Sequence, residues 1–457
     1  MSPLLILIIG IIAVIGMIIG LRVNAFIALV TAAILISLLA PGDLSQKVSR
    51  VADAFGGVVG AIGIVIALAA VIGKCLMDSG AADQIVRSFL KILGEKRASW
   101  ALMGSGFVLS VPVFFDTVFY LLVPLARSLC RRTGKNYVLY IAAIVAGAGI
   151  THTLVPPTPG PLFMAEVFGI DIGLMILIGL LVGLPTSAVG LLVCRIIDRF
   201  SQIPMRPYGG DPEPEPLTDE QLPPLWLSLL PVVLPVIFIS TNTITKVLAK
   251  AQDASLAIRR ANDITAIIGN PNFALLVSAA IAMYLVVVKR GLQLRDLASL
   301  VDKALMSGGV IILITAAGGA FGAMLRDAGI KEYVEKSMAS GGQDLGLMIL
   351  VVAFGVSSLV KFAQGSGTVA MITGASIFSA MGLSAETLGF HPVYLATAIG
   401  SGSLVGDWMN NSGFWIFSKM GVLTETETLK TWTILTAALG VTGLGFTVLL
   451  ARLMPMA

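Results

Sequence analysis

Four ionisable residues stand inside apolar runs of this 457-residue chain: Asp116, His152, Lys361 and Asp407. Ionisable side chains at the depth of a membrane are energetically costly, so they are default candidates for function. A carboxylate or imidazole shielded from water can change protonation near neutral pH, because desolvation disfavours its charged form. Asp116, His152 and Asp407 are therefore candidate proton carriers, and the sequence does not rank them. Lys361 is a candidate partner for one of the carboxylates.

Uncharged polar residues gather around the same four positions. They are Thr117, Thr153, Thr158, Gln364, Ser366, Gly367, Thr368, Asn410 and Asn411. Hydroxyl and amide groups suit a polyhydroxylated substrate, and the N-termini of interrupted helices offer backbone amides and partial positive charge to a carboxylate. The pattern predicts a binding site for a small hydroxylated carboxylate. We expect no cofactor and no metal, because two histidines and three scattered cysteines form no metal-binding motif.

Each of these residues also has a purely structural interpretation. Lys361 and Asp407 could neutralise each other as a structural pair, and His152 could be a hydrogen-bonded interior histidine. Asp116 could cap a helix by accepting bonds from backbone amides. The serine and threonine hydroxyls could bond to carbonyls of their own helices. The sequence leaves these alternatives open.

Two interrupted apolar stretches carry most of these residues. The first, Gly147 to Gly169, contains Pro156, Pro157, Pro159 and Pro161, which a continuous helix cannot accommodate. The second, Ala398 to Gly421, is loosened by glycines and rich in polar side chains. Unwound backbone at membrane depth is tolerated only inside protein or beside a water-filled cavity. A pair of such segments, one in each half of a membrane chain, indicates a transport site.

The composition is that of a membrane protein. Hydrophobic residues make up 56% of the chain and charged residues 12%, whereas soluble proteins have about 25% charged residues. Recurrent apolar runs predict an all-α polytopic protein with about ten crossings. The first run, Leu4 to Leu21, lacks a basic leader and a cleavage pattern, so we interpret it as a retained span. Without a long basic run, nucleic acid is not expected as a partner.

Two further kinds of element are expected. Ala81 to Leu93 and Asp327 to Met338 have the pattern of amphipathic helices lying at the membrane interface. Ala98 to Ser128 has basic residues at both ends, which places both ends on the cytoplasmic side. It is therefore predicted to be a re-entrant hairpin with Pro112 to Thr117 near its tip. Leu345 to Met381, around "KFAQGSGT", is the second hairpin candidate.

The two halves of the chain resemble each other. "GKCLMDSG" aligns with "GAMLRDAG", and Asp78 and Asp327 in these segments are 249 residues apart. The hairpins and interrupted stretches follow in the same order at nearly the same offset. The charge distribution orients the halves oppositely, so we expect an inverted repeat. The predicted domains are an N-terminal repeat (1–200), a Pro- and acid-rich linker (201–224) and a C-terminal repeat (225–457).

The motifs "HTLVPPTPGP", "PVFFDTVFYLLVP", "KFAQGSGTVAM" and "GSGSLVGDWMNNSGFW" resemble those of the bacterial gluconate:proton symporter family. The resemblance covers nearly the whole chain. It implies proton-driven uptake of gluconate or a related sugar acid across the bacterial inner membrane. It also implies kinship with a broader group of dimeric anion transporters that carry two re-entrant hairpins. In these, a transport domain moves against a scaffold like an elevator, so a homodimer is expected here.

Other functions remain as alternatives. Sodium-coupled members of the broader group carry Ser-Asn-Thr motifs at the hairpin tips, whereas the tips here read "FFDT" and "QGSGT", which favours protons. One branch of the resembling family carries D-serine, and a passive anion channel is a further possibility. Asp116 and Asp407, the latter preceded by Gly406, faintly resemble the aspartates of intramembrane aspartyl proteases. We expect a transporter and not an enzyme, because small polar residues surround each of the two aspartates.

Overall fold

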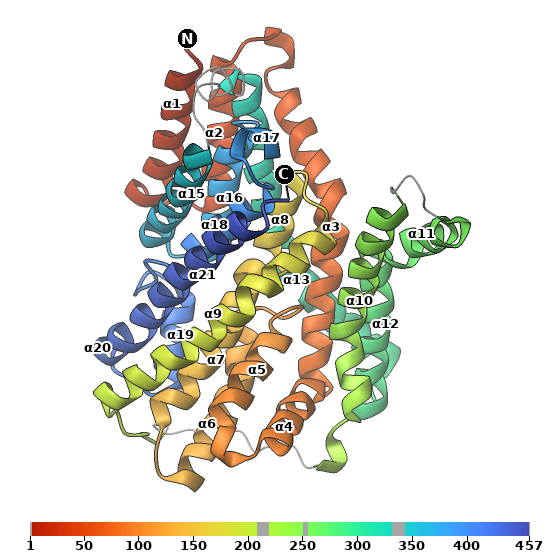
Figure 1. Cartoon of the computed structure of the whole chain (residues 1–457), viewed down its shortest axis with the longest axis vertical. Helices are drawn as coiled ribbons and strands as arrows, with labels where there is room; N and C mark the ends of the chain where they lie inside the picture. Colours follow the sequence, from red (N-terminus) through yellow and green to blue (C-terminus); the bar gives the residue numbers. More distant parts are fainter. Residues whose placement is uncertain (1, 208–218, 250–254, 331–342, 457) are drawn as a thin grey trace.

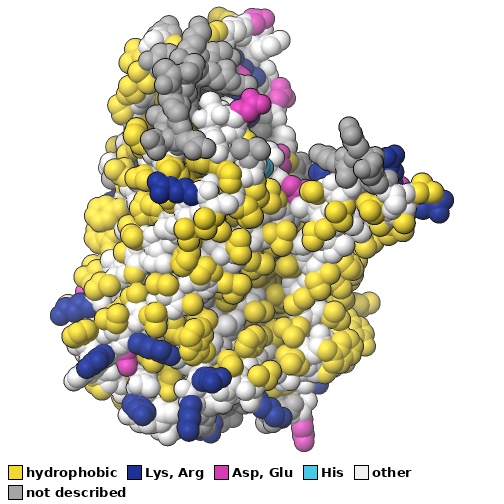
Figure 2. Space-filling model, viewed as in Figure 1, with side chains coloured by type: hydrophobic (Ala, Val, Ile, Leu, Met, Phe, Trp, Pro, Cys, Tyr) yellow, Lys and Arg dark blue, Asp and Glu magenta, His cyan; other side chains and the backbone are white. Residues whose placement is uncertain are grey.

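The computed structural model describes residues 2–207, 219–249, 255–330 and 343–456 of the chain (Figure 1). These residues are helical with no strand among them. Within the same ranges, eight helices are long and apolar enough to cross a membrane, and shorter apolar helices accompany them. On the face shown in Figure 2, hydrophobic side chains cover the middle of the molecule, and several Lys and Arg side chains gather at its lower end. The prediction of an all-α polytopic protein is confirmed.

A first group of helices packs around the long pair α3 and α13. Its members are α1 (Pro3–Ile15), α2 (Ala25–Leu39), α3 (Ser49–Asp78), α10 (Leu225–Ala249), α11 (Leu256–Ile268), α12 (Pro271–Arg290) and α13 (Leu294–Asp327). Helix α13 runs along α3 and α2, and α12 joins α3 to α10. Figure 1 shows α10, α11 and α12 on one side of the molecule. Small residues allow the central pair to approach closely, since a Cβ on Gly308 would lie 3.2 Å from that of Ala70.

A second group contains both helix pairs that were predicted as hairpins. α5 (Ala98–Leu109) and α6 (Phe115–Thr133) form the first pair, and α15 (Gln343–Gln364) and α16 (Gly367–Ser379) the second. Each pair is joined by a short turn at the predicted tip. The amphipathic helix α4 (Ala81–Leu93) has the predicted bounds and packs on α5 and α10. Most of its predicted counterpart, Asp327 to Met338, lies outside the described residues.

Both interrupted stretches are broken helices. The first forms α7 (Tyr137–Leu154) and α8 (Pro159–Val167), and the second α18 (Val393–Gly402) and α19 (Ser412–Met420). The long helices α9 (Ile172–Ser201) and α21 (Ile434–Leu453) pack against each other and against α7 (Figure 1). The short helices α17 (Ala385–Leu388) and α20 (Glu425–Thr428) precede α18 and α21.

Two helices extend beyond their apolar parts. Helix α13 begins at Leu294 and α9 continues to Ser201, and both extensions contain charged residues. The apolar pattern of a sequence marks only the part of a helix in contact with apolar surroundings, and a charged extension can remain helical in water.

The start of the predicted linker is fixed to the C-terminal half. The Arg206 guanidinium donates to both carboxylate oxygens of Glu427, at 2.7 and 2.6 Å, and to the Val422 carbonyl oxygen at 3.1 Å. The buried Arg127 side chain on α6 donates in turn to the Arg206 carbonyl oxygen at 2.7 Å. The acidic part of the linker, 208–218, lies outside the described residues.

The crossing of α5 and α7 depends on glycine. A Cβ on Gly147 would lie 2.8 Å from the Phe107 amide nitrogen and would clash with the Met103 carbonyl oxygen. We expect Gly147→Ala to lower stability by about 1–3 kcal/mol, as overpacking does. Thermal unfolding of the purified protein in detergent would measure this loss. Gly309→Ala is the matched control, since nothing lies within 4 Å of a Cβ at that helical site; an equal effect of the two variants would contradict the crossing.

Candidate functional site

The two broken helices meet beside a central cavity of about 380 Å³. Helices α7 and α18 cross where a Cβ on Gly400 would lie 2.5 Å from the Thr153 carbonyl oxygen. Thr153 on α7 and Ser403 beyond α18 both line the cavity. Its volume is within the range of small-molecule sites, about 300–1,000 Å³. The ends of α7 and α18 therefore meet at this pocket, whereas the unwound proline segment predicted to face the second break does not line it.

Most of the predicted site residues line this cavity. They are Asp116, Thr117, His152, Thr153, Lys361, Ser366, Gly367, Thr368, Asp407 and Asn411. They come from the first turn of α6, the end of α7, both sides of the α15–α16 turn and the break between α18 and α19. Helix N-termini carry unpaired amides and partial positive charge. Three such N-terminal turns, those of α6, α16 and α19, line the one cavity.

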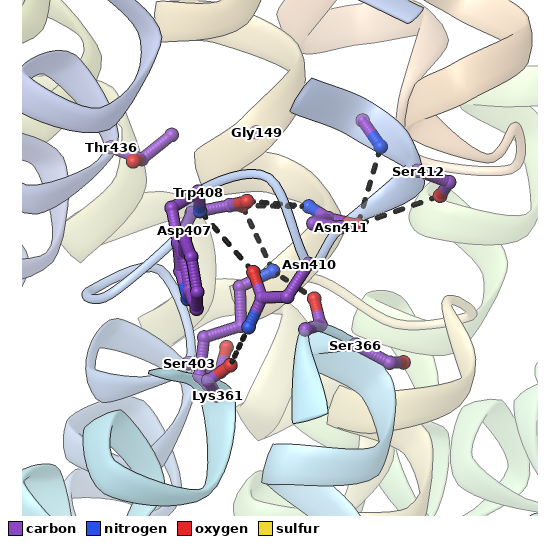
Figure 3. A network of polar contacts seen from close by, with 12 residues as sticks. Gly149, Lys361, Ser366, Ser403, Asp407, Trp408, Asn410, Asn411, Ser412 and Thr436 are labelled. Carbon is purple, nitrogen blue, oxygen red and sulfur yellow. Dashed lines mark hydrogen bonds and ion pairs between the residues drawn. The ribbon is translucent and has the colours of Figure 1, made fainter. Parts of the chain in front are cut away.

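Lys361 and Asp407 form a buried ion pair on the wall of this cavity. Their nitrogen and oxygen atoms are 2.8 Å apart, and their side chains are 3% and 4% exposed. The Lys361 ammonium also donates to the Gly365 carbonyl oxygen at 2.6 Å. The Asn411 amide donates to both oxygens of Asp407, at 2.7 and 2.8 Å. Figure 3 shows these side chains pointing toward one another. The structural pairing considered from sequence is thus formed.

Asp116 has a different environment, although it lies on the same cavity. It sits in the first turn of α6, whose N-cap is Phe114, so the capping interpretation of Asp116 is wrong. Its carboxylate accepts a long hydrogen bond of 3.4 Å from the Ser412 hydroxyl. In the described parts of the chain it makes no ion pair. Asp116 is half-buried, so it faces the cavity with little compensation from protein cations.

His152 is not the hydrogen-bonded interior histidine considered from sequence. Its Nδ1 atom is buried and has no hydrogen-bond partner among the described residues. Its ring packs edge-on against Phe114 at the tip of the first helix pair, with centroids 6.1 Å apart. Both residues line the cavity, so His152 remains a candidate for function.

Three predicted substrate ligands instead hold the unwound backbone. Thr158 donates to the Val155 carbonyl oxygen at 2.6 Å, across the first break. Gln364 donates to the Ser366 carbonyl oxygen at 2.5 Å. Asn410 donates to the Phe362 carbonyl oxygen at 2.6 Å. Thr158 and Asn410 satisfy carbonyls freed by helix interruption, whereas the Ser366 carbonyl oxygen also accepts from the Ala370 amide at 3.0 Å. None of the three side chains lines the cavity. The prolines of the first break also lie away from it, because α8 packs on α16 instead.

Left-handed glycines make the second break and the facing helix turn possible. Gly365 has φ +88° and Gly406 has φ +84°, values that side-chain-bearing residues rarely adopt. A Cβ on Gly365 would lie 2.6 Å from the Asn410 carbonyl carbon, so the turn between α15 and α16 rests directly on the break. A Cβ on Gly406 would lie 2.8 Å from that of Phe362.

Some cavity residues escaped sequence reasoning. Ser307 on α13, Trp432 before α21 and Thr436 on α21 line the cavity as single residues within apolar helices. An isolated Ser or Thr that bonds to its own helix carries no recognisable pattern; the Thr436 hydroxyl, for example, donates to the Trp432 carbonyl oxygen at 3.0 Å. Only the packing of α13 and α21 brings these residues to the site.

Apolar helices that break around a polar cavity are the arrangement of a membrane permease for a small solute. The sequence profile of GntP family permeases matches residues 2–454, and the chain belongs to this family. It is 36% identical to a gluconate permease of Pseudomonas aeruginosa, with 94% of this chain and 93% of the relative covered. An L-idonate transporter of Escherichia coli is 29% identical, with 97% of each chain covered.

The fold is also that of a solved transporter structure. The YdaH transporter of Alcanivorax borkumensis superposes with a TM-score of 0.65, at 13% identity, over 94% of this chain and 98% of that one. The protein is accordingly a multi-pass inner-membrane permease rather than an enzyme. This assignment removes the aspartyl protease alternative.

The buried ion pair provides a test of the site's electrostatics. Removing one partner leaves an uncompensated buried charge, so Lys361→Met or Asp407→Asn should each destabilise the protein by about 3–5 kcal/mol. The double variant removes both charges and should be more stable than either single variant. Thermal unfolding in detergent measures all three against the parent protein. Additive losses in the double variant would show that the pair is not energetically coupled.

Proposed function

We propose that this permease takes up gluconate or a related sugar acid together with protons. In this proposal Asp116 carries the coupled proton, and the protein works as a homodimer with an elevator mechanism. The family membership and the names of relatives, which carry gluconate and L-idonate, support the substrate class. The observation that carries the proposal is the half-buried Asp116 carboxylate facing a cavity lined by three helix N-termini.

The cavity offers a carboxylate the favourable ends of helix dipoles. The first turns of α16 and α19 bring Gly367, Thr368, Ser412 and Gly413 to the lining. Backbone amides in such turns lack backbone partners within their own helix and bind anions readily. The Gly413 amide already donates to the Asn411 side chain at 3.2 Å, so the anion would bind to the other first-turn amides. The one cation on the cavity wall, among the described residues, is Lys361, and Asp407 already neutralises it. We infer that the helix ends, rather than a free lysine, hold the substrate carboxylate.

The rest of the cavity suits hydroxyl groups. The Thr153 hydroxyl donates to the Ile150 carbonyl oxygen at 3.1 Å, and the Ser403 hydroxyl to that of Gly400 at 2.7 Å. Each of these hydroxyls has already donated its proton, so its oxygen is left to accept. A polyol can donate to such oxygens and accept from backbone amides at the same time. A sugar acid therefore matches both parts of the cavity.

Asp116 is the best-placed proton carrier of the three candidates. Asp407 pairs with the Lys361 ammonium and accepts two bonds from Asn411, so a role as proton carrier would disrupt all three contacts. Asp116 has only the long bond from Ser412 to lose. His152 lies deep at the end of α7, with an unpartnered Nδ1 atom, and we assign it a supporting role in shaping the wall beside Phe114.

The position of Asp116 also explains why proton and anion binding would be coupled. An ionised Asp116 repels a second carboxylate in the same cavity, and protonation removes that repulsion. The substrate thus binds more tightly to the protonated protein, and by linkage it raises the proton affinity of the site. Symport follows if only the empty and the doubly loaded proteins change conformation.

The division of the fold supports an elevator mechanism. We propose that the two helix pairs are re-entrant hairpins and move with the broken helices, while α3, α12 and α13 belong to the scaffold. The two parts meet at the first hairpin tip, where a Cβ on Gly73 would lie 3.4 Å from the Pro112 carbonyl oxygen, and at α16, which packs on α13. Helix α4, between α3 and α5 in the chain, would be an arm joining the two parts.

Uptake into proteoliposomes tests the function. We expect labelled gluconate to accumulate when the lumen is alkaline relative to the outside, and sodium gradients of either direction to have no effect. Unlabelled L-idonate and D-serine, added as competitors, identify the preferred substrate class. Accumulation that follows the sodium gradient would replace proton coupling with sodium coupling. Equilibration without accumulation would indicate a passive pathway and refute symport.

The role of Asp116 has its own prediction. Asp116→Asn should lower gradient-driven uptake by at least about fivefold, the lower end of typical coupling effects. Exchange of internal for external gluconate should fall much less, because the neutral amide mimics the protonated acid. Gluconate affinity of the parent protein, measured by calorimetry, should weaken as pH rises, and that of the variant should not. Glu166→Gln, at an exposed carboxylate on α8, is the matched control. Equal loss of uptake and exchange would remove Asp116 from the coupling role.

A further inference from the structure

A second, smaller cavity adjoins the central one between the first helix pair and helices α3 and α13. It has a volume of about 120 Å³. Phe114, Thr117 and Ser307 line both cavities, so the two spaces share a wall formed by these residues. Its remaining wall consists of the turn between α5 and α6 and of small or apolar residues on α3 and α13, together with two lysines, Lys74 and Lys303.

The two lysines also belong to a third cavity farther along the same helices. This outer space of about 280 Å³ is lined by Lys74 and Asp78 of α3 and by Asp296, Ser299, Leu300 and Lys303 of α13. The three cavities therefore follow one another, with Lys74 and Lys303 at the junction between the second and the third. The Asp78 carbonyl oxygen accepts a bond of 2.6 Å from Arg290 at the end of α12. The outer cavity thus lies where basic residues end the transmembrane helices.

The charge along this sequence of cavities is uneven. The middle cavity has two lysines and no carboxylate among its lining residues. The outer cavity has two lysines and two aspartates, and Lys74 is paired with Asp78 at 2.9 Å. The middle cavity, directly beyond Phe114, therefore has two lysines on its wall, one of them paired with Asp78 of the outer cavity. A narrow space lined by one sign of charge focuses its field and concentrates ions of the opposite sign.

We propose that Lys74 and Lys303 form a transient carboxylate-binding site on the path between the central cavity and the basic, cytoplasmic end of the protein. This inference rests on the proposed uptake of a sugar acid. The substrate leaves the central cavity past Phe114, Thr117 and Ser307. Its carboxylate then leaves the helix N-termini and binds the ammonium groups of the two lysines. Half-exposed Lys74 and exposed Lys303 remain hydrated, so the site holds the anion weakly and releases it.

The competing interpretation is purely local. Lys74 and Asp78 are four residues apart on α3, a spacing that forms surface ion pairs with little effect on function. Lys303 would then be an ordinary exposed side chain at a helix end. The two interpretations differ in the electrostatic potential at Ser307, which the path requires to be positive. They also differ in the effect that removing both lysines has on transport.

Cysteine labelling measures the potential without relying on transport. Ser307→Cys places a thiol on the wall shared by the two inner cavities, and the native Cys75, Cys130 and Cys194 are buried. The quantity to measure is the rate with a sulfonate-bearing methanethiosulfonate reagent divided by the rate with its trimethylammonium counterpart. This ratio should be higher in Ser307→Cys than in Ser307→Cys/Lys74→Gln/Lys303→Gln. The ratio of the two rates should fall about tenfold on removal of the lysines, the lower end of focusing effects. An unchanged ratio would overturn the proposal, whatever the substrate.

Transport then tests the role of the potential. In proteoliposomes, Lys74→Gln/Lys303→Gln should lower the maximal rate of gluconate uptake about tenfold, while gluconate affinity at equilibrium changes less than twofold, because the central cavity is intact. Lys74→Arg/Lys303→Arg should retain the rate, and Lys91→Gln, at an exposed lysine on α4, is the matched control. A normal rate in the double glutamine variant would refute the transport role.

Two further results keep the inference separate from folding and from the proposed function. If Lys74→Gln fails to fold because Asp78 loses its partner, Lys74→Gln/Asp78→Asn removes both charges, and Lys303→Gln tests the other side alone. A parent protein that carries no aldonate, yet shows the lysine-dependent labelling ratio, would refute the proposed substrate while supporting an anion path. A parent that carries gluconate with a lysine-independent ratio would refute the path alone.

Discussion

The structure depends on one constraint: backbone that leaves a helix inside a membrane must find its hydrogen-bond partners within the protein. Here the partners are mostly side chains of the interrupted segments themselves. Thr158 and Asn410 each donate to a carbonyl oxygen that a continuous helix would have bonded. The Lys361 ammonium does the same for Gly365 while it neutralises Asp407. These groups stabilise the breaks, and the breaks in turn provide the cavity.

The polar residues therefore fall into two sets: those that hold the unwound backbone and those with hydrogen-bonding capacity left for a ligand. Side chains used to hold the backbone are saturated with bonds, whereas Asp116, with one long bond, is not. An unsaturated carboxylate beside helix N-termini can respond to a ligand, and a saturated one can only be disrupted by it. Lys361 and Asp407 thus form a fixed ion pair on the cavity wall. We assign the change of protonation to Asp116 in the first helix pair.

Much of this could be predicted from the sequence, because the signals were local. Prolines and glycines mark both breaks, and the tips of both helix pairs fell at the expected residues. The sequence could not distinguish Thr153, which lines the cavity, from Thr158, which does not. Both are threonines at the same break, and only the three-dimensional path of the unwound backbone separates them. Ser307 and Thr436 were missed for a related reason, since tertiary packing alone brings α13 and α21 to the site.

The same reasoning bears on how charge is arranged for an anionic substrate. A free lysine in the central cavity would bind a carboxylate strongly and would hold it after transport. Helix ends bind it with partial charges, and the two lysines that could attract it lie outside, beyond Phe114. Under the proposed function, neutral hydrogen-bonding groups of the central cavity would select the substrate, and the full charges of Lys74 and Lys303 would act only along its path. A transporter must release what it binds, and partial charges and hydrated lysines would each bind the anion weakly enough for release.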